Sequence, residues 1–355
     1  MKEIGCGPRA IALVGPASAG KTSLAEALLL ASGGAKPGAR GGSAELSLMH
    51  CDWMGDHYLL IDMPGAADLD GDAATALAVA DLALVVVDPD PARAPLVEPV
   101  LRRLEALGVP HALFVNKIDQ ARGNIEDLLA SLQPMSTATL VARQIPILAG
   151  ERVAGFVDLA LERAYHYQPG KRSQQVPLAA HLKEGEHAAR VHMLEQLADH
   201  DDDLLEQLVS DQVPSLETIF GDLHREMAGG QIVPVLFGSA LNGFGVRRLL
   251  KMLRHDTPPA AATAERLGIE GAAIRIVRTA QDSKFGKLTL ARLFGGPLAE
   301  GREMTTAEGE TARTGAIFRL QGAAATKLAI AEAGDIVAIA KIETARVGQV
   351  FGIDG

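Results

Sequence analysis

The strongest constraint on this chain is one stretch near its start, residues 10–24, which reads AIALVGPASAGKTSL. Its apolar beginning has the composition of a buried parallel strand, and it leads directly into the pattern G-x4-G-K-T at residues 15–22. Glycines at those places permit backbone dihedrals that a side chain would forbid, so successive N–H groups can curl around phosphate oxygens. A helix expected from residue 23 would point its N-terminus at the anion. This stretch therefore predicts a phosphate-binding loop rather than a simple glycine turn.

Two residues of the loop carry candidate chemistry of their own. Lys21 supplies a cation for the outer phosphates of a nucleotide, and the Thr22 hydroxyl is a candidate ligand for Mg²⁺. The sequence assigns phosphate binding to a set of residues within this one loop, namely Gly15, Ser18, Ala19, Gly20, Lys21, Thr22 and Ser23.

A second motif follows two strand candidates, residues 46–52 and 57–62, and reads D-M-P-G from Asp62 to Gly65. An aspartate at the carboxyl end of a strand beside a phosphate loop can hold Mg²⁺, usually through water, and a glycine N–H there can sense a terminal phosphate. The pattern D-x-x-G alone is mostly a turn. Its place one strand pair after the phosphate loop favours Asp62 as a metal-site residue and Gly65 as a nucleotide contact.

The most specific signal is a strand, residues 112–115, that runs directly into Asn116-Lys117-Ile118-Asp119. The Asp119 carboxylate can accept hydrogen bonds from both N1–H and the exocyclic amine of guanine. The Asn116 amide would brace the loop, and the Lys117 stem would lie along the purine. Adenine lacks that pair of donors, and a site built for two hydrogen bonds rejects such an analogue by a factor on the order of 10⁴. The motif favours guanine recognition over a polar turn at a strand end.

A later strand, residues 233–237, ends in a loop of small residues that contains Ser239 and Ala240. Backbone N–H groups there could meet the guanine O6, and this loop is the last of four motifs in chain order. Strands and helices alternate over this part of the chain, with a buried strand at 82–87 and a helical pattern at 96–107. The alternation predicts an α/β fold with a doubly wound parallel sheet, whose ligand lies beyond the carboxyl ends of the strands.

The spacing of the motifs predicts three further divisions of the chain. A nucleotide-binding domain over 1–257 would be interrupted by an inserted subdomain at 144–230, because that segment separates the third motif from the fourth. A linker is expected at 258–270, and a small β-barrel at 271–355. The inserted segment contains an apolar stretch at 153–161 and helical patterns at 187–198, 202–209 and 216–227. The barrel is expected from strand candidates at 272–279, 287–294, 316–320 and 335–340.

An acidic triplet, Asp201 to Asp203, lies within the inserted segment. It could suggest a cation site, but an aspartate N-cap at the start of a solvated helix is the favoured interpretation.

The composition of the chain limits which classes of partner and which compartment we expect for it. The formal net charge of −10 argues against strong binding of free nucleic acid. No segment is long and apolar enough to span a bilayer, and no signal-peptide pattern is found at the N-terminus. Two cysteines, Cys6 and Cys51, are too few for a disulfide framework and fit a reducing compartment. We therefore expect a cytoplasmic protein without a membrane partner.

With its four motifs, inserted segment and barrel pattern, the sequence resembles elongation factor G, a translational GTPase, over nearly the whole chain. Barrel stretches such as GKLTLAR at 286–292 and AGDIVA at 333–338 are similar to that family's second domain. The resemblance implies a G domain with its inserted subdomain, a β-barrel, GTP or GDP as ligand, Mg²⁺, and the ribosome as partner. The three further domains of that family do not occur in these 355 residues.

The departures from the family pattern concern hydrolysis more than binding. The family follows D-x-P-G with a histidine that orients the attacking water, whereas this chain has Ala66. The family's first switch ends in R-G-I-T, and the matching residues here end in Gly42 and Ser43, so Ser43 keeps a metal-binding hydroxyl but Gly42 cannot form an apolar gate. Ser18 also stands where the family's phosphate loop has an aspartate.

Together these features predict a GTP- and GDP-binding translational GTPase that uses Mg²⁺ and hydrolyses GTP slowly. Thr22, Ser43 and Asp62 would serve the metal. A non-catalytic, nucleotide-gated module that docks on the ribosome is one alternative, and a ribosome-protection factor is another. Sequence outside these 355 residues would distinguish a ribosome-protection factor from a translational GTPase of the elongation factor G type.

Overall fold

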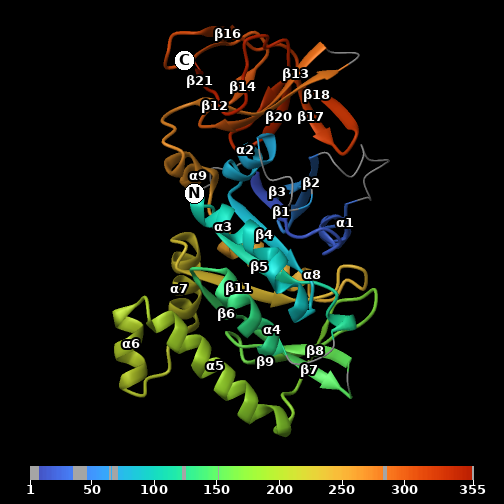
Figure 1. Ribbon diagram of the computed structural model, residues 1–355, viewed down its shortest axis with the longest axis vertical. Coiled ribbons are helices and arrows are strands. Elements are labelled where there is room, and N and C mark those ends of the chain that lie inside the picture. Colours follow the sequence, from blue (N-terminus) through green and yellow to red (C-terminus); the bar gives the residue numbers. More distant parts are fainter. Residues whose placement is uncertain are drawn as a thin grey trace. The chain divides into compact units, whose positions relative to one another are not determined.

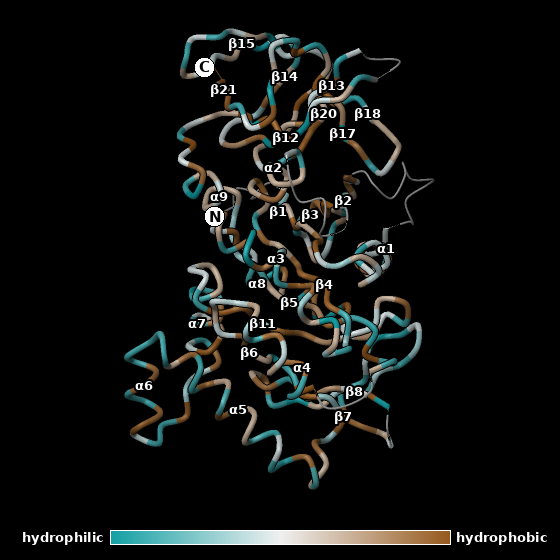
Figure 2. Tube along the Cα trace, viewed as in Figure 1, coloured by the Kyte–Doolittle hydropathy of each residue, from teal (hydrophilic) through white to brown (hydrophobic). Residues whose placement is uncertain are grey.

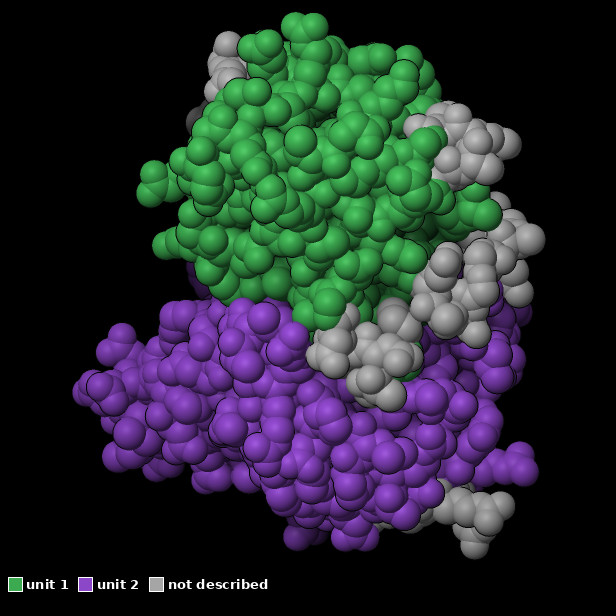
Figure 3. Space-filling view, turned by 45° about the horizontal axis from the view of Figure 1, so that its top comes forward, with its two compact units in different colours: residues 1–14, 32–83, 258–355 green, residues 15–31, 84–257 purple. Residues whose placement is uncertain are grey.

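The computed structural model describes residues 8–34, 46–63, 65, 71–121, 125–150, 152–282 and 286–353. The chain divides into two compact units (Figure 3). Unit 1 comprises residues 1–14, 32–83 and 258–355, and unit 2 comprises residues 15–31 and 84–257. Within the described residues, no helix combines the length and the apolar character that crossing a bilayer requires.

Unit 1 contains the strands around the first and second motifs. Strand β1 (Arg9–Val14) pairs in parallel with β3 (Asp56–Asp62), and β3 pairs antiparallel with β2 (Ser47–Trp53). The predicted strands at 46–52 and 57–62 are confirmed to within one residue. The β2–β3 hairpin turns at Met54 and Gly55, both of which have positive φ, at 52° and 89°. The short helix α2 (Asp72–Ala78) follows (Figure 1).

The C-terminal part of unit 1 is rich in β-structure. It begins with helix α9 (Ala260–Arg266), which lies within the stretch expected to be a linker. An eight-stranded sheet follows in the order β16-β15-β21-β12-β13-β20-β17-β18, in which the described pairs are antiparallel. Its strands are β12 (Ala273–Asp282), β13 (Gly286–Phe294), β15 (Glu303–Thr305), β16 (Thr311–Arg313), β17 (Ile317–Gln321), β18 (Ala324–Leu328), β20 (Ile336–Ala340) and β21 (Val350–Ile353).

The four strand candidates in this region are confirmed as β12, β13, β17 and β20. The other strands of this sheet, and the separate pair β14 (Leu298–Ala299) and β19 (Ile330–Ala331), carried no recognisable sequence signal. Several of them are only two or three residues long, which is too short for an alternating pattern. Their apolar side chains nevertheless join one core, which includes Leu298, Met304, Ala331 and Phe351.

Unit 2 carries the remaining strands of the parallel type, including all of β4 except its first two residues, which belong to unit 1. Strand β11 (Ile232–Phe237) pairs in parallel with both β5 (His111–Val115) and β6 (Thr139–Ala142), and β5 has β4 (Leu82–Val87) on its other side. The six residues of β4 are all apolar and buried, and β4 is traced in brown in Figure 2. The associated helices are α1 (Lys21–Ala31), α3 (Glu98–Ala106), α4 (Ile125–Leu132) and α8 (Val246–Asp256), with short 3-10 turns η2 (Pro91–Val97), η3 (Ile118–Gln120) and η4 (Gln133–Met135).

Residues 144–230 form a sheet and three helices between β6 and β11. The antiparallel sheet has the order β10-β9-β8-β7, from β7 (Gln144–Ala149), β8 (Arg152–Asp158), β9 (Arg163–His166) and β10 (Gln174–Val176). A short turn, η5 (Ala180–Leu182), precedes helices α5 (Lys183–Ala198), α6 (Asp202–Val209) and α7 (Leu216–Ala228). Helices α5 and α6 alternate between hydrophilic and hydrophobic residues (Figure 2), which is typical of helices with one packed face.

The three predicted helices of this segment are confirmed, and so is the role of the acidic triplet. Asp201 is the N-cap of α6, and its carboxylate accepts a hydrogen bond from the Leu204 N–H at 2.8 Å. Two ion pairs connect helix α8 to this region: Arg248 of α8 lies 2.5 Å from Asp158 of β8, and Asp256 of α8 lies 3.1 Å from Arg143, directly before β7.

Candidate functional site

The phosphate loop of unit 2 needs glycine at both ends of its motif. Gly15 has φ of +135° and Gly20 has φ of +99°, values that side-chain-bearing residues rarely adopt. A Cβ added to Gly15 would lie 2.3 Å from the Val86 carbonyl oxygen, and one added to Gly20 would lie 2.3 Å from the Asn116 amide nitrogen. The two glycines therefore let the loop pass close to β4 and to the guanine motif, which no other residue type would allow.

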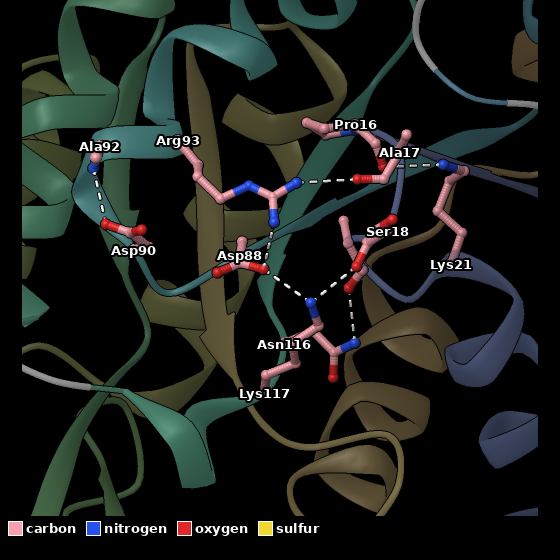
Figure 4. A network of polar contacts seen from close by, with 11 residues as sticks. Pro16, Ala17, Ser18, Lys21, Asp88, Asp90, Ala92, Arg93, Asn116 and Lys117 are labelled. Carbon is pink, nitrogen blue, oxygen red and sulfur yellow. Dashed lines mark hydrogen bonds and ion pairs between the residues drawn. The ribbon is translucent and has the colours of Figure 1, made fainter.

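The carbonyl oxygens of the loop are held by side chains. The Lys21 ammonium, which is buried, donates to the carbonyls of Gly15 at 2.9 Å and Pro16 at 3.1 Å. The Lys117 ammonium donates to the Ser18 carbonyl at 2.8 Å, and the Asn116 amide donates to the Ala19 carbonyl at 2.9 Å (Figure 4). Helix α1 begins at Lys21, two residues before residue 23, where the sequence predicted its start. The reason is that the Leu24 N–H already bonds to the Gly20 carbonyl at 2.9 Å.

Hydrogen bonds bring the third and fourth motifs together, although they lie about 120 residues apart. The Asn116 side-chain oxygen accepts from the Ala240 N–H at 2.9 Å, and the Ile118 N–H donates to the Gly238 carbonyl at 3.0 Å. Lys117 adopts the left-handed conformation, with φ of 58°, directly after β5. Asn116 therefore joins the phosphate loop to the Ser239–Ala240 loop, since its amide nitrogen and oxygen bond to one each.

Asp119 directly follows Ile118, whose N–H belongs to this junction, and its carboxylate has spare hydrogen-bonding capacity. Its Oδ1 atom is buried and has no hydrogen-bond partner among the described residues. An unpaired carboxylate oxygen gains from N–H donors, so a ligand that reaches Asp119 with such donors would be favoured there. That property matches the edge of a guanine base.

The loop that contains Ser239 is closed by its own backbone. Ser239 and Phe244 exchange N–H to carbonyl hydrogen bonds, both at 3.0 Å, and the Asn242 amide donates to the Ser239 hydroxyl at 3.0 Å. The Phe244 ring stacks on Tyr167, with ring centroids 4.6 Å apart and an interplanar angle of 3°. Tyr167 follows strand β9, so the 144–230 segment packs directly against this loop.

The remaining predicted site residues are placed as follows. Asp62 is buried at the end of β3 in unit 1, opposite Leu13 in the register, and Gly65 follows in the same unit. Thr22 and Ser23 lie half-buried in the first turn of α1. Ser43, Gly42 and Ala66 lie outside the described residues. Among the described residues, no group of three His, Cys, Asp or Glu side chains is arranged to hold a metal ion.

Two residues of the site were missed by sequence reasoning. Asp88 and Arg93 follow β4, and their side chains join the network around the phosphate loop (Figure 4). The sequence DPDPAR at 88–93, directly after a buried strand, is the signal that could have identified them.

Comparisons with known proteins agree with the motifs. Residues 8–259 match the family profile of the elongation factor Tu GTP binding domain. The chain is 34% identical to an elongation factor G-like protein of Synechocystis sp., over 97% of this chain and 54% of that protein. It is 30% identical to elongation factor G 2 of Streptomyces coelicolor, over 89% of this chain and 48% of that protein.

Structural comparison gives the same result. A crystal structure of a protein from Thermus thermophilus superposes with a TM-score of 0.81 and 25% sequence identity, covering 99% of this chain and 55% of that one. The predicted fold class is confirmed as an α/β fold with a parallel-sheet G domain and a β-rich second domain. The chain spans about half the length of the curated relatives it matches. The chain therefore belongs to the family of the elongation factor Tu GTP-binding domain, and over nearly its whole length it is similar to elongation factor G-like proteins.

Proposed function

We propose that this chain binds GTP and GDP and acts as a translational GTPase of the elongation factor G type on the ribosome. The observation that carries the guanine assignment is the junction of the third and fourth motifs: Asn116 accepts from the Ala240 N–H, and the Ile118 N–H, next to Asp119, donates to the Gly238 carbonyl. The phosphate loop, with its carbonyls held by side chains, would receive the phosphates. The similarity to elongation factor G relatives supports the ribosome as partner.

We further propose the division of the chain given by its motifs. Residues 1–257 form the G domain, with 144–230 as its inserted subdomain, followed by a linker at 258–270 and a β-barrel at 271–355. The nucleotide-binding residues are those of the phosphate loop and of the other three motifs: Gly15, Ser18, Ala19, Gly20, Lys21, Thr22, Ser23, Asp62, Gly65, Asn116, Lys117, Asp119, Ser239 and Ala240.

We also propose Mg²⁺ as cofactor, because the motifs supply oxygen ligands of the kind that this metal prefers. Mg²⁺ in nucleotide sites is held by one or two protein oxygens together with phosphate oxygens and water, so no carboxylate cluster is required. The Thr22 and Ser43 hydroxyls would be direct ligands, and Asp62 would hold a metal-bound water. When bound, the metal would neutralise charge on the outer phosphates.

Titration with fluorescent GDP and ADP tests the nucleotide assignment. We expect GDP to bind at least roughly 10³-fold more tightly than ADP, because adenine lacks the two donors that Asp119 would bind. Comparable affinity for the two nucleotides would contradict the proposal.

One alternative function is favoured by a specific observation. Ala66 stands in place of the water-orienting histidine, which supports a nucleotide-gated ribosome-binding module that does not turn over GTP. Single-turnover hydrolysis with and without ribosomes separates the two functions. Ribosome-stimulated release of phosphate supports the slow GTPase, and ribosome binding that depends on GTP without any phosphate release supports the module.

A further inference from the structure

One side chain that contacts the phosphate loop belongs to none of the four motifs. The Arg93 guanidinium donates through Nη2 to the Ala17 carbonyl at 3.0 Å (Figure 4). Arg93 lies in η2, whose N-cap is Asp90: the Asp90 carboxylate accepts from the Ala92 N–H at 3.0 Å, and the Arg93 N–H donates to the Asp90 carbonyl at 3.0 Å. The turn from which Arg93 extends is therefore fixed locally.

A single carboxylate orients Arg93 together with the lysine of the guanine motif. The Asp88 Oδ2 atom lies 3.3 Å from Arg93 Nη1 and 2.8 Å from the Lys117 ammonium. The Asp88 side chain is only 14% exposed, so its charge is incompletely screened by water. This anion offsets the repulsion between two cations that bond to neighbouring carbonyls, those of Ala17 and Ser18.

Fixing a carbonyl also fixes the N–H that follows it. A trans peptide group is planar, so the carbonyl of one residue and the N–H of the next point in opposite directions. The Ala17 carbonyl held by Arg93 therefore aims the Ser18 N–H away from Arg93. The Ala19 carbonyl held by Asn116 likewise aims the Gly20 N–H. Ser18 has a left-handed φ of 64°, a conformation that is unfavourable for a serine. Hydrogen bonds from side chains outside the loop help to stabilise that conformation.

The side chains that donate hydrogen bonds to the loop carbonyls differ in whether they must give up those bonds when a nucleotide binds. Lys21 bonds to the Gly15 and Pro16 carbonyls here, and it must leave them if its ammonium is to meet phosphate oxygens. Arg93, Lys117 and Asn116 can keep their bonds, because their donors are not needed for the phosphates.

We propose that Arg93, oriented by Asp88, is a positioning residue for nucleotide binding. It keeps the Ala17–Ser18 peptide turned so that the Ser18 N–H faces the bound phosphates, and so it slows nucleotide release. This inference rests on the proposed function, since it assumes that the loop holds the phosphates of a guanine nucleotide.

Nucleotide release from variants of the whole chain tests this role. In Arg93→Gln we expect GDP to dissociate roughly tenfold faster, as is typical for loss of one partly exposed, charge-assisted hydrogen bond. Arg93→Lys should recover part of the loss, and Asp88→Asn should resemble Arg93→Gln. Arg102→Gln is the matched control, because Arg102 is an exposed arginine in the next helix that pairs only with Glu98 among the described residues.

Guanosine separates positioning from a merely structural role. It carries the base without phosphates, so its competition constant should be unchanged in Arg93→Gln if Arg93 acts through the phosphate loop. GDP release at the wild-type rate, or equal weakening of GDP and guanosine, would overturn the inference.

Inorganic pyrophosphate distinguishes failure of this inference from failure of the proposed function. We expect pyrophosphate to raise the thermal midpoint of the wild type and to raise that of Arg93→Gln less. If the wild type responds to pyrophosphate but not to GDP, and Arg93→Gln responds to pyrophosphate less than the wild type, the guanine assignment is wrong while the role of Arg93 in positioning the phosphate loop stands. If both proteins respond equally to pyrophosphate, the role of Arg93 is wrong.

Discussion

At the scale of single residues, the proposed choice of base depends on the carboxylate of Asp119, and its replacement tests that proposal. A carboxylate offers only acceptors, whereas an asparagine amide offers one acceptor and two donors. In Asp119→Asn we expect GDP affinity to fall by roughly 10²-fold or more, and xanthosine diphosphate affinity to rise, because the amide donates to the carbonyl that xanthine has in place of the guanine amine. Competition against fluorescent GDP measures both constants.

Asp127→Asn provides the control for this exchange, because Asp127 is an exposed aspartate on the nearby helix α4. It should change neither constant. Unaltered discrimination between GDP and xanthosine diphosphate in Asp119→Asn would show that another residue reads the base.

Ala66 sets the second expectation at this scale, on sequence grounds alone. A methyl group can neither accept a proton nor polarise water, and loss of one well-placed polar group at a reacting centre typically costs ~10²–10³ in rate. Ala66→His should therefore raise the single-turnover rate of GTP hydrolysis measured with ribosomes. A wild-type rate equal to that of a histidine-bearing translation factor, assayed in parallel, would mean that a different group positions the water.

At the scale of elements, helix α7 carries a buried acid without a hydrogen-bond partner. Glu226 is fully buried, and neither of its carboxylate oxygens has a hydrogen-bond partner among the described residues. Burial, reinforced by the neighbouring Asp222 carboxylate, raises the pKa of Glu226 to about 8. The folded protein therefore holds this proton more tightly than the unfolded chain does.

The sign of the pH effect follows from that difference. Below the ordinary pKa of 4.5 both states are protonated, and between 4.5 and about 8 only the unfolded state ionises, so stability falls as the pH rises. Glu226→Met removes the ionisable group, and its advantage over the wild type should be larger at pH 8 than at pH 5 by about 2–4 kcal/mol. Urea unfolding at the two pH values measures this difference.

Glu217→Met is the matched control, because Glu217 is exposed on the same helix. It should show no comparable pH dependence. Equal stability differences for Glu226→Met at pH 5 and pH 8 would show that Glu226 is ionised in the folded state.

At the scale of the whole molecule, a buried ion pair connects sequence segments that are more than 200 residues apart in unit 1. Arg292 of β13 donates to the Asp81 carboxylate at 2.8 Å, and both side chains are fully buried. The same carboxylate accepts from the Ala10 N–H at 2.7 Å and from the Thr263 hydroxyl at 2.6 Å. Asp81 thus joins β1, helix α9 and the β-rich part of the unit.

Removing only the arginine of this ion pair should lower the stability of the fold more than removing both charges. Arg292→Met leaves a buried carboxylate uncompensated, and we expect it to lower the free energy of unfolding by ~3–5 kcal/mol. The double variant Asp81→Asn with Arg292→Met should lose less, because no unpaired charge remains. Chemical denaturation compares them, with the exposed Arg313→Met of β16 as the control. A double variant no more stable than Arg292→Met alone would show that the charge is not the cause.

The structural features that the sequence by itself determines are those formed by residues close together in the chain. The strand, the glycines and the lysine of the phosphate loop lie within fifteen residues, so their order in the chain is also their order in space. The Asp201 N-cap and the helices α5, α6 and α7 follow from capping and apolar spacing, which act over a few residues. The predicted choice of guanine over adenine likewise rests on four consecutive residues, 116–119.

The tertiary structure decides which distant groups meet. The Ala240 N–H reaches Asn116 across 124 positions, Arg93 reaches Ala17 across 76, and Arg292 reaches Asp81 across 211. None of these pairs has a local pattern, because each depends on which strands lie side by side and in what register. A sequence motif records what a short segment does with its own backbone, but a contact between segments exists only after the sheet and its connections have placed them together.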